Sequence, residues 1–267
     1  MKFKNLAAAL ALSGIATLSA PASSITLTNS AGSFTNFGGF DWASNGTAQV
    51  IGFNPASPTN TFALDYWASA VSVTDPFGAV IAGATIGILN GSYEYTIFAQ
   101  LNETSTCNVF SGGVCVDATF TVTGGTYSIW YDTAHNANQI TGAGITDGNL
   151  LITGNLLSQP GGGFNVISGG NAVLQGVVTF TNSAFITPPL TGTTAATTLQ
   201  IGSNVTGWAP PTSMPNTPPP GSTQPLPANS FSLQADANQI FRAPEPGSLA
   251  LLGLGIGALA LLRRRSA

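Results

Sequence analysis

The sequence predicts an all-β body, either an antiparallel β-sandwich or a jelly-roll-like domain, and three observations lead to this prediction. Apolar and polar residues alternate with a period of two through residues 93–101 and 114–122, as in half-buried strands. Gly, Asn and Pro separate these two segments from weaker strand signals. Because 43% of the residues are hydrophobic and 15 are Phe, the chain can build a packed core. Many short strands at such spacing are typical of sandwich and jelly-roll domains.

Several weaker segments complete the predicted body. Residues 79–89 suit a short helix and a strand equally, because two glycines interrupt a run of β-branched residues. Residues 210–227 contain eight prolines and no charge, which predicts a semi-rigid spacer or a long loop. The weaker strand signals are residues 24–28, 49–53, 61–67, 126–131, 149–157, 173–181, 197–201 and 230–235.

The two strongest strands are expected to form a hairpin with a long loop over residues 103–113. Cys107 falls in this loop, and Cys115 falls on the polar face of the second strand. Outside the cytosol the default state of such a pair is a disulfide, although two inert thiols are the alternative. Closing so short a loop contributes about 2 to 3 kcal/mol of stability by the chain-entropy estimate.

Charge is scarce and unevenly placed. Residues 23–243 contain no lysine, and Arg242 is their only basic residue against nine acidic ones, which leaves a net charge of −8. This pattern excludes most soluble cytosolic enzymes. It also argues against nucleic-acid binding, because that requires cationic side chains to neutralise phosphates.

The N-terminus has the pattern of a secretory signal peptide over residues 1–22. Lys2 and Lys4 form a basic region, and residues 6–18 form an apolar run. The exported domain is therefore expected to span residues 23–243. The predicted cleavage site consists of Ala20, Ala22 and Ser23.

The C-terminus carries an uncharged run over residues 247–262 that ends in a cluster of three arginines. As a helix this run would be about 24 Å long, short of the roughly 30 Å hydrocarbon core, but local thinning and snorkelling arginines allow insertion. The arginines are expected to stay cytoplasmic. A buried helix of a globular domain is the alternative. The arginine flank consists of Arg263, Arg264 and Arg265.

Pro244, Glu245 and Pro246 stand directly before this run. The tripeptide, the short apolar helix and the arginine cluster together resemble a PEP-CTERM sorting signal, here residues 244–267. The resemblance implies that an exosortase, a membrane-embedded cysteine transpeptidase-like enzyme, recognises the tripeptide and removes the helix after transient inner-membrane insertion. It also implies a Gram-negative host that makes extracellular polysaccharide, with delivery to the cell surface or the biofilm matrix.

Residues 230–242 also resemble the flocculation-associated branch of PEP-CTERM proteins. This second resemblance implies a structural or adhesive role in holding cells and exopolysaccharide together. The alternatives are a lectin-like carbohydrate-binding module, which calcium could assist, and a secreted polysaccharide hydrolase. Two groups of aromatic residues can either stack on sugar rings or fill the core. They are Phe34, Phe37, Phe40 and Trp42, and Tyr127, Trp130 and Tyr131.

Signs of catalysis are few, and no catalytic residue, metal site or cofactor is expected. His135 is the only histidine, and Asp132 precedes it by three residues in a turn-like sequence. The motifs of serine hydrolases, zinc peptidases, P-loop proteins and dinucleotide-binding proteins are all missing. Asp132, Asp147 and Asp236 are candidate calcium ligands, but none lies in a loop with EF-hand spacing.

Overall fold

The computed structural model describes residues 24–85, 92–202, 208–217 and 220–242. The predicted signal peptide and sorting signal lie outside these residues. Within the described part every regular element is a strand, and no helix able to span a membrane is found there. The predicted all-β body is therefore confirmed.

Fifteen strands make up the described part of the chain. Residues 80–85, which suited a helix or a strand, form a strand. The bounds are β1 (Thr26–Asn29), β2 (Gly32–Thr35), β3 (Gly39–Ile51), β4 (Thr59–Thr74), β5 (Val80–Thr85), β6 (Glu94–Ser111), β7 (Val114–Asp132), β8 (Asn149–Leu156), β9 (Gln159–Asn165), β10 (Gly169–Thr181), β11 (Ile186–Thr187), β12 (Thr194–Ile201), β13 (Ser213–Asn216), β14 (Ser222–Pro225) and β15 (Ser230–Arg242).

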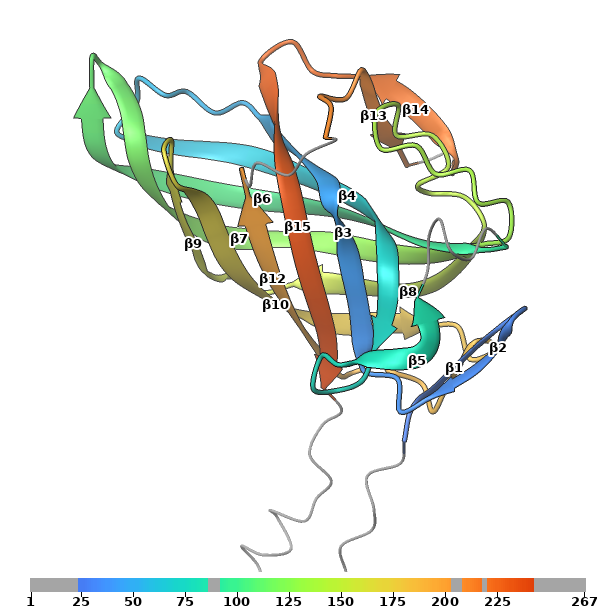
Figure 1. Ribbon diagram of the computed structural model, residues 1–267. Helices are drawn as coiled ribbons and strands as arrows, with labels where there is room; N and C mark the ends of the chain where they lie inside the picture. The colour runs from blue at the N-terminus through green and yellow to red at the C-terminus, as the bar shows by residue number, and fades with distance from the viewer. Residues whose placement is uncertain (1–23, 86–91, 203–207, 218–219, 243–267) are drawn as a thin grey trace, which may run out of the picture. The chain divides into compact units, whose positions relative to one another are not determined.

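The main sheet is antiparallel throughout and closes on itself. Its order is β12-β15-β3-β4-β6-β7-β8-β10, and β10 pairs with β12 to complete the circuit. The result is sandwich-like, with β15 and β3 in one layer and β6, β7 and β8 in the layer behind (Figure 1). The strand β9 lies between β7 and β10, beyond the end of β8. The closed sheet thus has an interior and an outer face.

The β6–β7 hairpin is longer than expected, and the predicted loop over residues 103–113 is wrong. Ser111 pairs with Val114, so only Gly112 and Gly113 form the turn. These two glycines have φ values of 61° and 81°, which glycine adopts without strain. The consecutive residues Thr104, Ser105 and Thr106 let β6 continue past Glu103, because small hydroxyl-bearing residues suit a strand with one exposed face.

Gly124-Gly125, expected to separate two strands, is instead an irregularity inside β7. The register between β6 and β7 shifts here, opposite Asn102 and Glu103. Gly125 has a φ of 152°, and a Cβ at this position would lie 2.2 Å from the Gln100 carbonyl oxygen. The glycines therefore allow close backbone approach and a change of face, without ending the strand.

Cys107 and Cys115 form the predicted disulfide, with 5.8 Å between their Cα atoms. Cys107 lies in β6, not in a loop, and Cys115 is buried, not on an exposed polar face. The connection between β3 and β4 covers the pair: the Cys107 N–H donates to the Pro58 carbonyl and the Cys115 N–H to the Pro55 carbonyl, each at 2.8 Å. The disulfide therefore links the two strands of the hairpin in its distal half, and the two backbone hydrogen bonds attach this half to the β3–β4 connection.

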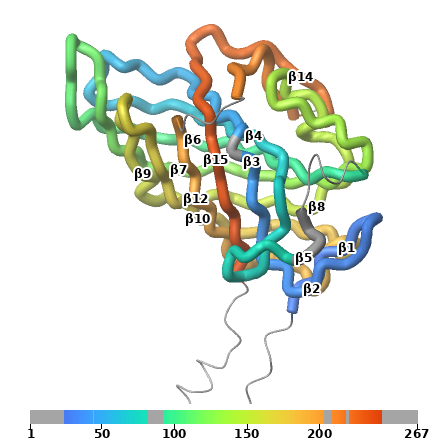
Figure 2. Tube along the Cα trace, viewed as in Figure 1, coloured from blue at the N-terminus to red at the C-terminus, as the bar shows by residue number. Residues whose placement is uncertain are grey.

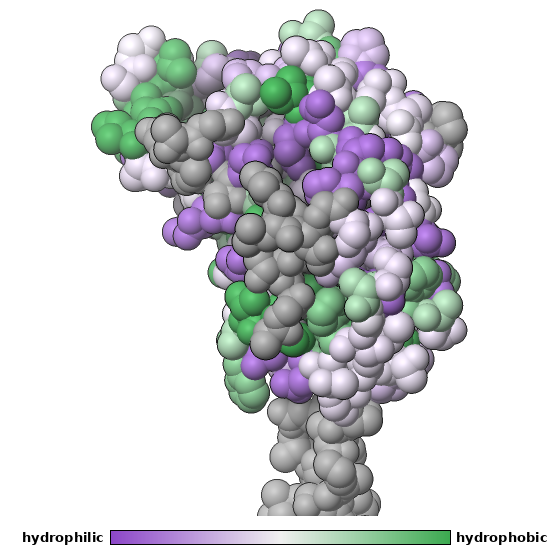
Figure 3. Space-filling model, turned by 45° about the vertical axis from the view of Figure 1, so that its right-hand side comes forward, coloured by the Kyte–Doolittle hydropathy of each residue, from purple (hydrophilic) through white to green (hydrophobic). Residues whose placement is uncertain are grey.

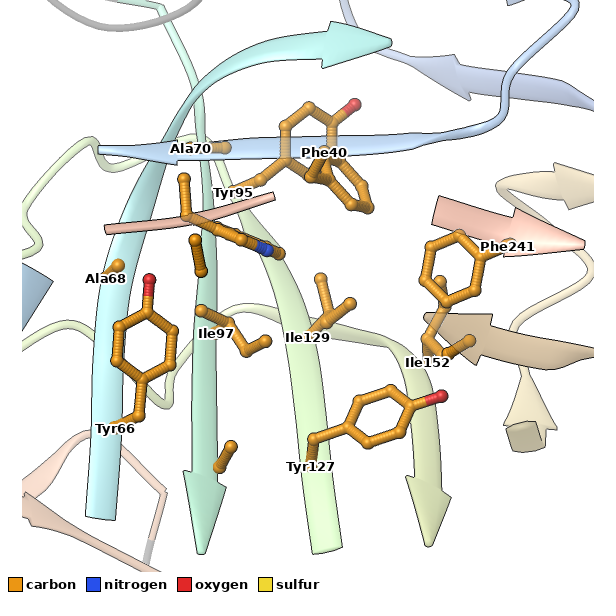
Figure 4. Close-up of a cluster of buried hydrophobic side chains, with 14 of the residues drawn as sticks. Phe40, Tyr66, Ala68, Ala70, Tyr95, Ile97, Tyr127, Ile129, Ile152 and Phe241 are labelled. Carbon is orange, nitrogen blue, oxygen red and sulfur yellow. The ribbon is translucent and has the colours of Figure 1, made fainter. Parts of the chain in front are cut away.

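Apolar side chains fill much of the interior of the closed sheet. Tyr95 and Ile97 of β6 and Tyr127 and Ile129 of β7 point into one cluster, together with Phe241 of β15 (Figure 4). Most of the aromatic residues considered for sugar stacking belong to this core, namely Phe34, Phe37, Phe40, Trp42, Tyr127 and Tyr131. Burial removes them from contact with a polymer.

A second cluster lies on the outer face of β4, β6 and β7, beneath a cover. It contains Trp67, Phe98 and Trp130 from the sheet, with Ile145 and Met214 from the cover. Trp130 is thus buried as well, but on the outer face of the sheet. This explains why it occupies the opposite face of β7 from Tyr127 and Tyr131, which point into the interior. The cover consists of residues 133–148 and the β13–β14 hairpin, and Figure 2 shows the loop after β7 beside β14.

The proline-rich segment is part of this cover, so the prediction of a spacer is wrong for its described residues. Ser213 Oγ donates to the Thr141 carbonyl at 2.7 Å, and the Gly221 N–H donates to Thr146 Oγ1 at 3.0 Å. Proline lacks an N–H, so a segment this rich in proline forms an isolated two-stranded hairpin more readily than a strand within a sheet.

Candidate functional site

A polar groove of about 540 Å³ lies on the outer face of the main sheet, across β7, β9, β10 and β12. Strand pairing sets one row of it: Thr119 pairs with Gly163, Gly163 with Asn171, and Asn171 with Gln200. Gly163 has no side chain, so the surface is hollow between Thr119 and Asn171. The neighbouring position Ala118 points inward and is buried, as the period of two requires.

Asp117 stands at one end of the groove, held by two amides. Asn165 Nδ2 donates to its Oδ2 at 3.1 Å, and Asn108 Nδ2 donates to its Oδ1 at 2.8 Å. These hydrogen bonds hold the pKa of the Asp117 carboxyl below its usual value. Asn165 Oδ1 in turn accepts the Ile167 N–H at 2.9 Å, which fixes the orientation of that amide.

The groove offers hydroxyl, amide and carboxylate groups, all of which exchange hydrogen bonds with polyhydroxylated molecules. No cationic side chain lines it, and Arg242, the one arginine in the described part of the chain, pairs with Thr194 away from the groove. The arrangement therefore suits a neutral polar polymer and disfavours a polyanion.

The candidate catalytic residues His135 and Asp132 lie in and beside the loop after β7. His135 is exposed in the loop after β7, and Asp132 Oδ1 accepts the Ala134 N–H at 3.0 Å. The nearby Glu94 Oε1 accepts the N–H groups of Asn136 and Ala137 at 2.8 and 2.9 Å. Both carboxylates thus shape the backbone of the loop.

The structure does not bring the candidate calcium ligands together. Asp132 and Asp147 flank the loop between β7 and β8, whereas Asp236 pairs with Gln200 beside the polar groove. Nowhere in the described ranges do three or more His, Cys, Asp or Glu side chains gather as metal ligands.

Sequence reasoning missed the polar groove, because its residues come from five strands and form no motif. The available signal was a set of amide residues at outward positions of predicted strands. Which of these positions become neighbours depends on the pairing of β9 with both β7 and β10, and β9 itself was not predicted.

Comparison with protein-family models identifies residues 242–266 as a PEP-CTERM protein-sorting motif. No curated protein and no solved structure matches the chain significantly. The match confirms the resemblance seen at Pro244, Glu245 and Pro246. The match covers only the C-terminal end, so it supports sorting and gives no information on the function of the body.

The protein is therefore exported, inserted transiently in the membrane and sorted to the cell surface by an exosortase. The sorting residues themselves lie outside the described part of the chain, as does the predicted signal-peptide cleavage site. The body from β1 to β15 is the part whose chemistry the structure describes.

Proposed function

We propose that the mature protein is a non-enzymatic structural or adhesive component of the surface or extracellular matrix of a Gram-negative bacterium. In this proposal it takes part in exopolysaccharide-dependent flocculation or biofilm formation, and the polar groove is its contact with the polymer. The observation that carries the proposal is a groove of oriented amides, hydroxyls and one carboxylate on a body that is sorted to the cell surface.

Hydrogen bonding is the mode of contact that the side chains support. The aromatic groups that seemed suited to stacking are buried, and cationic side chains for an acidic polymer do not line the groove. A polymer engages many such weak sites at once, so modest affinity per groove is sufficient for cohesion.

The test is titration of the mature protein, purified from the extracellular fraction, with the exopolysaccharide of its host. We expect binding, with Asn171→Ala and Gln200→Ala together weakening it about tenfold. Asn155→Ala is the matched control, since Asn155 is an exposed amide on β8 outside the groove. Equal binding by wild type and the double variant would place the polymer contact elsewhere.

The lectin-like alternative has the same groove in its favour and differs in the ligand. A lectin would bind a short defined oligosaccharide as tightly as the polymer, whereas a matrix component gains from repeated contact along the chain. Repeating the titration with oligosaccharides, with and without a chelator, separates the two. Shortening of the polymer during incubation would instead indicate a hydrolase.

The processing step has its own test by mass spectrometry of the extracellular protein. Exosortase trimming should remove peptides from residues 249–262. Their persistence in the surface-delivered form would contradict removal of the helix.

A further inference from the structure

An apolar pocket of about 410 Å³ opens into the interior of the closed sheet, at the end that carries the β6–β7 turn. Its volume falls within the range of about 300 to 1,000 Å³ that is typical of small-molecule sites. The wall is built from inward-pointing side chains of several strands. Among them are Val50, Phe62, Leu64, Phe120, Leu199 and Leu233.

The pocket exists because small residues stand where large ones would close the interior. Ala118, Gly161 and Gly170 line it. Gly170 pairs with Phe164, and Phe164 pairs with Ala118. Ala118, Phe164 and Gly170 therefore form one row across the wall. In the same sheet, the other end of the interior is filled by aromatic rings such as Tyr95 and Phe40, whose centroids lie 5.1 Å apart.

Glu103 is the one polar side chain deep in the wall. It follows Leu101 on the inward face of β6 and is only 5% exposed. None of the described residues donates a hydrogen bond to its carboxyl or forms an ion pair with it. Burial raises the pKa of this carboxyl to about 7. An acidic group buried without a partner is destabilising, so its position in a ligand-sized pocket suggests a role toward a ligand.

The entrance of the pocket is apolar as well. Val114 and Val166 line the pocket, and both are about half exposed. Val109, Phe110 and Ile167 add exposed apolar surface on the neighbouring turns. The β9–β10 turn is joined to the start of β7, next to the β6–β7 turn, where the Val166 N–H donates to the Val116 carbonyl at 3.1 Å. Figure 3 shows apolar side chains gathered at the upper left, the end that carries the hairpin turn in Figure 1.

The charges around the pocket limit the ligand. Glu103 lies inside and Asp117 lies in the lining, and no basic residue of the described ranges lines the pocket. Arg242 is at the far end of β15 from the pocket residue Phe231, about 35 Å away at the rise of an extended strand. An anionic head group would therefore meet only carboxyls, whereas a hydrogen-bond donor or a cation would find a partner.

We propose that this pocket binds one apolar small molecule whose amine or hydroxyl group donates a hydrogen bond to the Glu103 carboxyl. The apolar part of the ligand packs against Phe62, Phe120 and Leu199. The pocket faces the interior and the polar groove lies on the opposite side of the same wall, so the two share lining residues such as Asp117 and Asn171. Their tests use different ligands, an apolar probe and a polymer, so one proposal can fail without the other.

The test uses the fluorescent apolar amine N-phenyl-1-naphthylamine with the mature protein, followed by competition below micelle-forming concentrations. We expect enhanced probe fluorescence at one site per chain. Dodecylamine and dodecanol should displace the probe, with dodecanoate at least tenfold weaker. Absence of probe binding by folded protein, or competition by dodecanoate equal to that by dodecylamine, would overturn the proposal.

Two variants connect the binding to this pocket. Glu103→Gln keeps the shape of the side chain but loses its negative charge, so the preference for dodecylamine over dodecanol should fall about tenfold while probe binding persists. Ala172→Phe places a ring in the pocket and should displace the probe. Asp132→Asn is the control, because it removes a carboxylate charge at a position that does not line the pocket. An unchanged head-group preference in Glu103→Gln would exclude Glu103 as the ligand partner.

Discussion

The two ends of the closed sheet are built from the same strands but filled differently. At the end where the body begins and ends, Phe40, Trp42 and Tyr95 pack with ring centroids 5.1 Å apart. At the hairpin end, the same inward face of β6 presents Glu103, and the interior holds a pocket. The alternation of side chains along a strand determines which residues face the interior. The size of those side chains determines whether the interior is a packed core or a pocket that can bind a ligand.

The largest expected effect is loss of a ring from the filled end. Trp42 is fully buried, so Trp42→Ala should lower the free energy of unfolding by about 3 to 5 kcal/mol through lost contacts and a cavity. Phe120→Ala, in the wall of the existing pocket, should cost clearly less. Urea unfolding of both variants measures the difference, and equal losses would remove the energetic distinction between the two ends.

Removing the disulfide should loosen the pocket end alone. The double variant Cys107→Ser and Cys115→Ser should lower the free energy of unfolding by about 2 to 3 kcal/mol, because the unfolded chain gains freedom. Hydrogen exchange should rise in the distal parts of β6 and β7 more than around Tyr95. Uniform acceleration along both strands would show that the two ends unfold as one unit.

The buried carboxyl gives the pocket end a pH dependence. The folded-state pKa of Glu103 is raised from 4.5 to about 7, so the folded state holds this proton in the range where the unfolded state has lost it. The free energy of unfolding should therefore fall as the pH rises from about 4.5 to above 7. Glu103→Gln should stabilise the protein by on the order of 2 kcal/mol at pH 8 and have little effect at pH 4.

Thermal unfolding of wild type and Glu103→Gln across this pH range is the measurement. Asp65, buried beneath the outer cover with its pKa raised to about 6, adds a slope of the same sign that remains in both proteins. Asp117→Asn should not reproduce the gain, because Asp117 is only partly buried and hydrogen bonds from Asn165 and Asn108 lower its pKa. A pH profile unchanged by Glu103→Gln would mean that its carboxyl is solvated.

The smallest expected effect is at the entrance. Phe110 is 44% exposed at the hairpin turn, so Phe110→Ser should change the free energy of unfolding by less than about 0.5 kcal/mol. It should nevertheless weaken binding of the naphthylamine probe a few-fold, because exposed apolar surface beside the entrance is lost. A large drop in stability would instead place Phe110 in the core of the folded body.

Local patterns in the sequence were enough to predict the all-β body, most of its strands, the Cys107–Cys115 disulfide and the sorting motif. They failed where the structure depends on pairing between segments that are distant in the sequence. Gly124-Gly125 looked like a break, because glycine in a single chain gives no sign that a neighbouring backbone such as Gln100 approaches it. Trp130 looked equally suited to a surface, since the residues that cover it, Ile145 and Met214, lie far along the chain.

The groove and the pocket were beyond prediction for a related reason. Both lie on the wall formed by β7, β9 and β10, one outside it and one inside. Three consecutive glycines at residues 161–163 predicted a break between strands, yet they occupy β9, where a side chain on Gly162 would obstruct the neighbouring strand. A Cβ on Gly162 would lie 1.9 Å from the Asn171 carbonyl oxygen. The sequence shows the glycines but not what they approach.

In the matrix role proposed above, copies of the protein would be crowded together, and closure of the main sheet then has a consequence. Each strand of the closed circuit β12-β15-β3-β4-β6-β7-β8-β10 has a paired neighbour on both sides. Exposed sheet edges are the usual templates for joining one chain to the next. Copies crowded into a matrix are thus protected against fusing through their main sheets. We expect cohesion between them to pass through side chains and polymer, so that it stays reversible.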